Sequence, residues 1–270
     1  MMSTLHEGPP TPLELRLLYW SSMLQTQHLN KAPIVEALID FRVRPHKNFD
    51  LSQLESSLAS IKARYPTTKP VRHFVSHFQV KDHEPPQQST SETKRGLRFE
   101  SADGLHVFQA HPDGFTVSRL RPYETWESLF AEAQVLWSEY VKAARPEAIV
   151  RVATRFINRI QIPMPVADYQ DYLSAPPNVP KGLPELVSEF FSRVVIHDPT
   201  SGGVIVFTQA MEPVNEASNI LPLYVDIDVF KQDSCDVHSA QPWELLNTFR
   251  HLKNEAFFAS ITPKTLELLR

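Results

Sequence analysis

The sequence has little of several features that often identify a protein class. Its one cysteine, Cys235, excludes an internal disulfide bond and a zinc site built from cysteines, as is usual in a reducing compartment. No apolar run approaches the roughly 20 residues of a membrane span. Near the N-terminus, the apolar stretch from Leu13 to Leu24 is broken by charges and lacks a cleavage site of the signal-peptide kind. We therefore expect a cytoplasmic protein with no membrane contact.

Motifs of the common cofactor and catalytic sites are also missing. The sequence contains no GxGxxG, no P-loop, no HExxH, no GxSxG and no CxxC. We therefore predict no cofactor. A formal net charge of −4 gives no general attraction to nucleic acid, so the expected partner is a protein or a small-molecule ligand.

Apolar residues are plentiful, and they are unevenly placed. They make up 42% of the 270 residues, enough for a sizeable core. Residues 1–29 contain a proline-rich stretch and read as an N-terminal extension, whereas 30–270 read as a single domain. Met23 lies just before the regular pattern begins, which leaves Met1 and Met23 as alternative native starts.

Alternation of apolar and polar residues predicts a first strand from Ala32 to Val43, and spacings of three and four predict a helix over 51–65. A meander follows, with strands expected at 71–80, 97–101, 105–110 and 115–121. The polar residues 81–96 between the first two read as a mobile hairpin tip. Thr125 then begins a long amphipathic helix that reaches Ala144, with Trp137 on its apolar side.

The same outline recurs in the second half of the chain. A strand over 147–162 precedes a proline-rich passage over 163–184, strands at 186–197, 203–212 and 222–230, and a helix over 242–260. We therefore predict an α+β fold with a mainly antiparallel, twisted sheet and long amphipathic helices packed on it. The order strand, connection, meander, helix occurs twice and predicts two pseudo-repeat halves, about 30–146 and 147–270.

The stretch RVATRFINRIQI, residues 151–162, combines arginines with β-branched and aromatic residues. Since strand side chains alternate, Arg151, Arg155 and Arg159 share one face, opposite an apolar face interrupted by Asn158. These arginines are candidates for an anion or ligand site, because guanidinium groups bind phosphate and carboxylate. The alternative is structural pairing with carboxylates of neighbouring strands, which the overall acidity of the protein favours.

Four carboxylates are available for such pairing. Glu36 and Asp40 lie on the polar face of the first strand and are further candidates for the anion or ligand site, and Asp226 and Asp228 lie on the polar face of LPLYVDIDVF. Two carboxylates spaced two apart on a strand also suit a divalent cation in phosphoryl transfer. Asp226 and Asp228 are therefore metal-ligand candidates, and the alternative is the ordinary alternation of any solvated sheet face.

Four blocks together resemble a known family. They are NKAPIVEALIDF, RVATRFINRIQI with its Arg-Phe-Ile-Asn-Arg core, the Asp-Ile-Asp strand, and FRHLKNEAFFASITPKTLELL. In order and spacing, over about residues 28–268, they are similar to a sporadically distributed family of uncharacterised bacterial and archaeal proteins. The resemblance implies no activity. A patchy distribution implies accessory genes, such as defence or toxin-antitoxin cargo.

Two functions remain open from the sequence. The first is a non-catalytic binding or regulatory protein, indicated by a well-formed core without catalytic motifs. The second is a metal-dependent enzyme acting on a phosphate-containing substrate, with a divalent metal on Asp226 and Asp228 and with Arg155 and Arg159 stabilising charge. The geometry separates them, because the enzyme needs both carboxylates to open onto a pocket that Arg155 also reaches.

Overall fold

A computed structural model describes residues 29–47, 49, 51–79, 87–183, 187–212 and 219–270. It contains one antiparallel sheet of nine strands, in the order β2-β3-β4-β5-β1-β6-β9-β8-β7. The strands are β1 (Ile34–Arg44), β2 (Thr67–Gln79), β3 (Gln87–Glu100), β4 (His106–His111), β5 (Gly114–Leu120), β6 (Ala148–Pro163), β7 (Phe191–His197), β8 (Val204–Met211) and β9 (Ile220–Lys231). The helices are α2 (Leu51–Ser57), α3 (Trp126–Ala144), α4 (Gln241–Ser260) and α5 (Pro263–Leu268), with 3-10 turns η1 (Leu58–Ala63) and η2 (Tyr169–Asp171).

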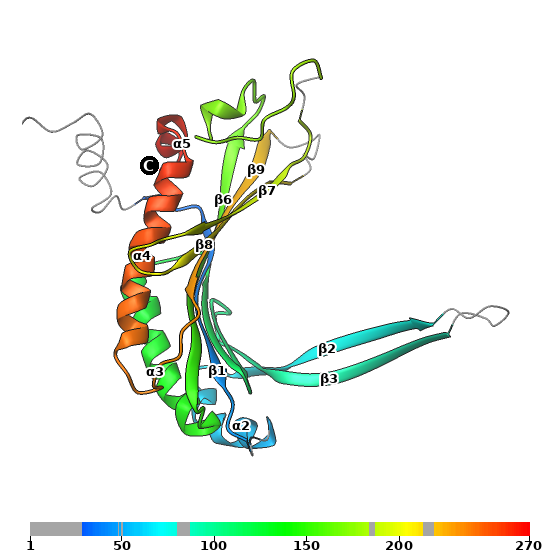
Figure 1. Cartoon of the computed structure of the whole chain (residues 1–270), viewed down its shortest axis with the longest axis vertical. Helices are drawn as coiled ribbons and strands as arrows, with labels where there is room; N and C mark the ends of the chain where they lie inside the picture. The colour runs from blue at the N-terminus through cyan, green and yellow to red at the C-terminus, as the bar shows by residue number, and fades with distance from the viewer. Residues whose placement is uncertain (1–28, 48, 50, 80–86, 184–186, 213–218) are drawn as a thin grey trace, which may run out of the picture.

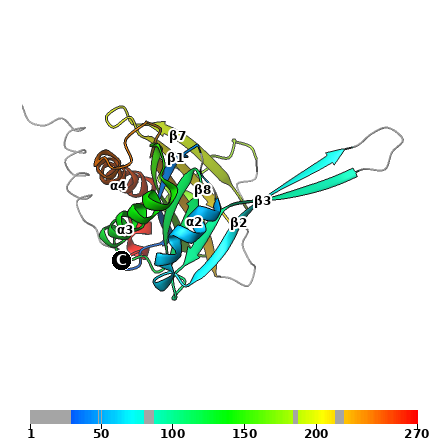
Figure 2. The ribbon, with the colours of Figure 1, turned by 90° about the horizontal axis from the view of Figure 1, so that it is seen from below.

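The sheet is bent, and its two faces have different surroundings. Helices α3 and α4 run side by side along the outer face, while the hairpin of β2 and β3 projects away on the other side (Figures 1 and 2). We call the face opposite α3 and α4 the open face. The predicted α+β class with a mainly antiparallel sheet is confirmed.

The strand order is nearly symmetric about the centre of the sheet. β1 and β6 pair with each other, β5 lies on the outer side of β1, and β9 lies on the outer side of β6. Each half of the chain therefore contributes its first and last strands to the middle of the sheet. That the halves are repeated units of one domain stays a prediction.

The core lies between the sheet and the helix layer. In α3 the Thr125 hydroxyl accepts a hydrogen bond from the Ser128 N–H and caps the helix, as its sequence position predicts. The buried side of α3 then places Trp137 against Phe41 of β1 and Phe115 of β5. The expected core role of Trp137 is confirmed, since it is only 5% exposed.

Several elements differ from the sequence-based expectation. Residues 87–96, expected in a polar tip, belong to β3 and pair with β2, whereas 80–86 lie outside the described residues. The alternation of apolar and polar residues does not predict the projecting part of the β2–β3 hairpin. No helix covers this part, so neither of its faces has to be apolar. The helix expected over 51–65 is α2 followed by the tighter turn η1, which ends before the restricting Pro66. Residues 1–28, most of the expected extension, also lie outside the described part.

Candidate functional site

The centre of the open face is built by three neighbouring strands, β1, β6 and β9. Their register places Leu38 beside Arg155, and Arg155 beside Asp228. Because the odd positions of β6 point to the open face, its arginines stand between the carboxylates of β1 and those of β9. The sequence places these residue types on one face, and the strand order brings them within reach of one another. We call this group the ion-pair strip; its members are Glu36, Asp40, Arg151, Arg155, Arg159, Asp226 and Asp228.

Arg151 joins the two outer strands of the ion-pair strip. Its Nη1 donates to Asp40 Oδ1 at 2.9 Å, and its Nη2 donates to Asp228 Oδ2 at 3.0 Å. The guanidinium also lies over the Phe230 ring, 4.5 Å from the centroid. One arginine therefore neutralises carboxylates from both neighbours of β6.

Asp40 is the most enclosed carboxylate of the strip. It is 5% exposed, yet its oxygens have several donors. In addition to Arg151, the Thr116 hydroxyl donates to Oδ2 at 2.8 Å, and Arg42 Nη2 lies 3.3 Å from the same oxygen. A buried carboxylate with this many donors is satisfied within the protein and has little capacity left for a ligand.

Arg155 binds Asp226 in a bidentate pair. Its Nε donates to Oδ1 at 2.8 Å and its Nη2 donates to Oδ2 at 2.5 Å. This hydrogen bonding raises the pKa of the Arg155 guanidinium. Glu36 adds to that shift at a distance, although within the described residues its carboxylate forms no ion pair or hydrogen bond.

The remaining arginine pairs outside the predicted set. Arg159 Nη2 lies 3.6 Å from Glu212 Oε2, just beyond the end of β8. Tyr224 of β9 joins this pair, and partial burial together with its hydrogen bond to Glu212 raises the pKa of the phenol. Sequence reasoning missed Glu212, because the identity of the strand beside β9 does not follow from the sequence.

The two aspartates of β9 do not form an open carboxylate pair. Asp226 is held by Arg155 and Asp228 by Arg151. Burial raises the pKa of Asp228, and the neighbouring Arg151 opposes the shift. Among the described residues, no group of three or more His, Cys, Asp or Glu side chains is placed to hold a metal ion. A cation at this position would have to displace both arginines, so the geometry does not fit a metal site.

Asn158 has the structural role that its sequence position predicts. It is 3% exposed, and its Nδ2 donates to the carbonyl oxygen of Val225 at 2.9 Å. A second, longer contact of 3.4 Å joins the same nitrogen to the Phe156 carbonyl oxygen. The buried amide therefore fastens β6 to β9 directly beneath the ion-pair strip.

We expect Arg155→Ala to lower the free energy of unfolding by about 1 kcal/mol, because it removes a bidentate pair that is partly exposed. Chemical denaturation of Arg155→Ala, Asp226→Ala and the double variant measures the coupling energy. A double variant no less stable than either single variant indicates a structural pair. Strictly additive losses would contradict a structural role for the pair.

The open face becomes apolar towards β8. Val206 of β8 lies beside Asp228, and Val204 lies beside Phe230. These side chains are half-buried, and the helix layer does not cover them because they lie on the opposite face. The sequence contains a signal for this patch, since β8 reads VIVFTQAM with apolar residues on both of its faces. The open face thus combines a charged centre with an apolar flank.

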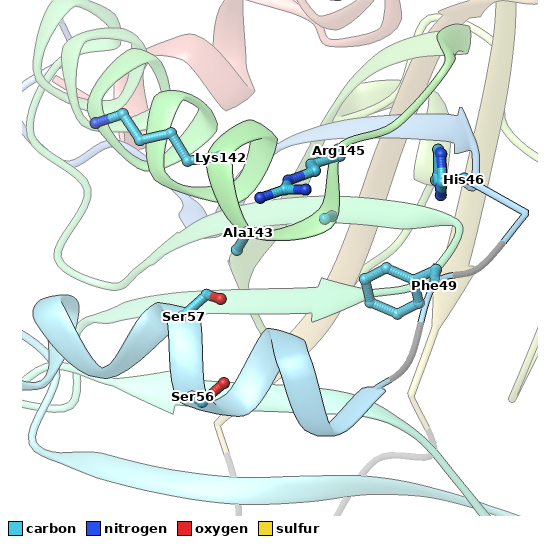
Figure 3. Close-up of a pocket in the computed structure, with 8 residues that line it drawn as sticks. His46, Phe49, Ser56, Ser57, Lys142, Ala143 and Arg145 are labelled. Atoms are coloured by element: carbon cyan, nitrogen blue, oxygen red, sulfur yellow. The ribbon is translucent and has the colours of Figure 1, made fainter.

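A hollow of about 400 Å³ lies apart from the ion-pair strip, between α2 and the end of α3. Ser57, Phe49 and Arg145 border it, while Lys142 points its amine away and pairs with Glu139 at 2.7 Å (Figure 3). Arg145 ends α3 with φ 49°, a left-handed conformation that glycine adopts more easily. No carboxylate borders this hollow among its lining residues.

A scan of the sequence against models of protein families finds no match, and a search of curated proteins finds none either. The resemblance drawn from the four sequence blocks therefore stays a prediction. Within the described ranges, no helix has the length and apolar character needed to cross a membrane.

Proposed function

We propose that this chain is a non-catalytic binding protein that takes up a protein partner on its open face. The observation that carries the proposal is the pairing within the ion-pair strip. Asp40, Asp226 and Asp228 are each bound by an arginine, so none of them is poised as a base or a metal ligand. A partner that covers charged groups pays a smaller desolvation free energy when those groups are already neutralised by ion pairs than when they are free.

The apolar flank supports a protein rather than a small ligand. Phe230, Val204 and Val206 lie next to the charged strip on a broad sheet face. Arginine and aromatic side chains are enriched in protein-protein interfaces, and here the Arg151 guanidinium lies over the Phe230 ring. The accessory role implied by the sequence resemblance, such as defence or toxin-antitoxin cargo, agrees with a protein whose task is to bind another.

Bulky substitutions on opposite faces test this function. Thr208 of β8 points to the open face beside Asp226, whereas Val135 is exposed on α3 in the helix layer. We expect affinity purification of the full chain from its native host to retain a specific protein with Val135→Trp and to lose it with Thr208→Trp. Thermal melting of both variants confirms that each is folded.

Retention of the same partner by both variants, or no specific partner with the unmodified chain, would overturn the proposal. The metal-dependent alternative has its own signature. It requires hydrolysis of a phosphate ester that depends on Mg²⁺ or Mn²⁺ and is lost in both Asp226→Asn and Asp228→Asn. Such activity in the purified chain would replace the binding function by the enzymatic one.

A further inference from the structure

Among the described strands, β7 forms one edge of the sheet and pairs only with β8. Two backbone hydrogen bonds bracket this pairing: the Met211 N–H donates to the Phe190 carbonyl, and the Asp198 N–H donates to the Gly203 carbonyl. Because hydrogen-bonded residues alternate along an antiparallel ladder, the even positions of β7 bond to β8. The backbone groups of Phe191, Arg193, Val195 and His197 therefore face outward.

Large apolar side chains of this edge strand are exposed on both faces of the sheet, next to Arg193 and His197 on the open face. Phe191 is 72% exposed and Val195 47% on the open face, and Val194 is 48% and Ile196 45% exposed on the helix side. Exposure of large apolar side chains in the described part of the chain is thus concentrated on one short strand. A strand that completes this edge must bring apolar side chains on both of its faces.

The opposite edge of the sheet is protected, and β7 is not. β2 contains Pro70, which has no N–H to offer, and its register with β3 shifts between Val71 and Arg72. It also carries Lys69, paired with Glu100 at 2.9 Å. Proline, charge and an irregular register are the usual devices that prevent an edge strand from pairing with another chain. β7 has neither a proline nor a shift in its register with β8.

We propose that β7 pairs antiparallel with β7 of a second copy of this chain, joining two sheets into one across a two-fold axis. The inference is independent of the partner proposed for the open face. The strand is self-complementary in the sense that a two-fold interface requires, since it supplies the apolar side chains on both faces that the edge demands.

One register uses all of the outward backbone groups. With Val194 at the two-fold axis, Phe191 lies opposite His197 of the second copy, and Arg193 lies opposite Val195. Each outward residue then exchanges a pair of hydrogen bonds with its partner. Shifting the strands by two residues in one direction would put Arg193 opposite Arg193 and leave His197 unpaired. The Val194 register has no like charges directly opposed.

This register predicts opposite effects of two charges at one position. Val195→Lys places a lysine opposite Arg193 of the second copy, whereas Val195→Glu places a carboxylate there. We expect sedimentation equilibrium to show a dimer for the unmodified chain and for Val195→Glu. The dissociation constant should rise by at least about tenfold for Val195→Lys. Val135→Lys and Val135→Glu on α3 serve as matched controls and should leave the dimer unchanged.

A cysteine at the axis checks the pairing directly. Residues opposite each other at a non-hydrogen-bonded antiparallel position have Cα atoms about 4.5 Å apart, within the range that a disulfide spans. Oxidised Val194→Cys should migrate as a covalent dimer and Val135→Cys as a monomer, while the native Cys235 stays buried. A monomeric unmodified chain at about 100 µM, equal weakening by both charges at 195, or no crosslink would each overturn the proposal.

Discussion

Trp137→Ala is expected to lower the free energy of unfolding by about 3 to 5 kcal/mol, because it leaves a cavity among aromatic side chains. The Trp137 ring lies 4.9 Å from that of Phe41, 5.2 Å from that of Phe115 and 5.5 Å from that of Tyr140, centroid to centroid. Its Nε1 donates to the buried carbonyl oxygen of Val237 at 3.1 Å. The residue therefore joins β1, β5 and α3 to the segment that precedes α4. Urea denaturation measures the loss.

Trp137→Phe separates the two contributions. It keeps an aromatic ring in the cluster and removes the hydrogen bond to Val237, so we expect a cost of about 1 to 2 kcal/mol. A melting temperature of Trp137→Ala close to that of the unmodified chain would contradict the core role of this side chain. It would also remove the main support for the packing of α3 on the sheet.

Lys253→Met is expected to raise the free energy of unfolding by about 2 kcal/mol at pH 6, because it removes a cation from an apolar site. The Lys253 Nζ lies 3.5 Å from the centroid of the Phe156 ring, between α4 and β6. Among the described residues it has no carboxylate partner, and the neighbouring charge is that of Arg250, which itself pairs with Glu127 at 2.7 Å. Burial, and secondarily the charge of Arg250, lower the pKa of Lys253 to about 7.

The gain from Lys253→Met should shrink as the pH rises. Between pH 7 and 10.5, the native state binds fewer protons at Lys253 than the unfolded state, so the unmodified chain gains stability with increasing pH. Below pH 7 the amine is protonated in both states, and the full cost of burying the charge is present. Guanidinium denaturation of both proteins at pH 6 and pH 9 measures the difference. Equal pH dependence of the two would show that Lys253 titrates normally.

Lys253→Gln provides a control of similar length. It removes the charge but keeps a polar end group against the Phe156 ring, so its gain at pH 6 should be smaller than that of Lys253→Met. A loss of stability in both variants would indicate that the ammonium contributes more by its contact with the ring than it costs by burial.

The faces of individual strands were predictable from the sequence. Alternation in RVATRFINRIQI separates the arginines from the buried face. The structure places the arginines, half-buried, on the face opposite the core and confirms the anchoring role of Asn158. Local rules also predicted α3 and its Thr125 cap. The short helix α5 was missed, although Thr262 followed by Pro263 is the usual start of a helix.

The pairing of particular residues was not predictable, because it depends on strand order. Arg155 faces Asp228 in the register yet binds Asp226, one diagonal step along β9. Glu36 lies on the expected face and has no direct partner among the described residues. Arg159 pairs with Glu212, to which no sequence pattern points. For the same reason, the sequence could not identify β7 as the unprotected edge. A strand becomes an edge only through the positions of all the others.

The central position of β1 and β6 affects how the protein is made. Residues 34–120 supply β1 to β5, and one side of β1 stays unpaired until β6, more than a hundred residues later in the chain, has left the ribosome. One side of β6 likewise stays unpaired until β9 has been synthesised. Sheets that depend on such distant segments fold in milliseconds to seconds rather than microseconds. During synthesis, the strands that later occupy the middle of the sheet are therefore temporary edge strands. A chaperone that shields the nascent β1 should raise the yield of folded protein.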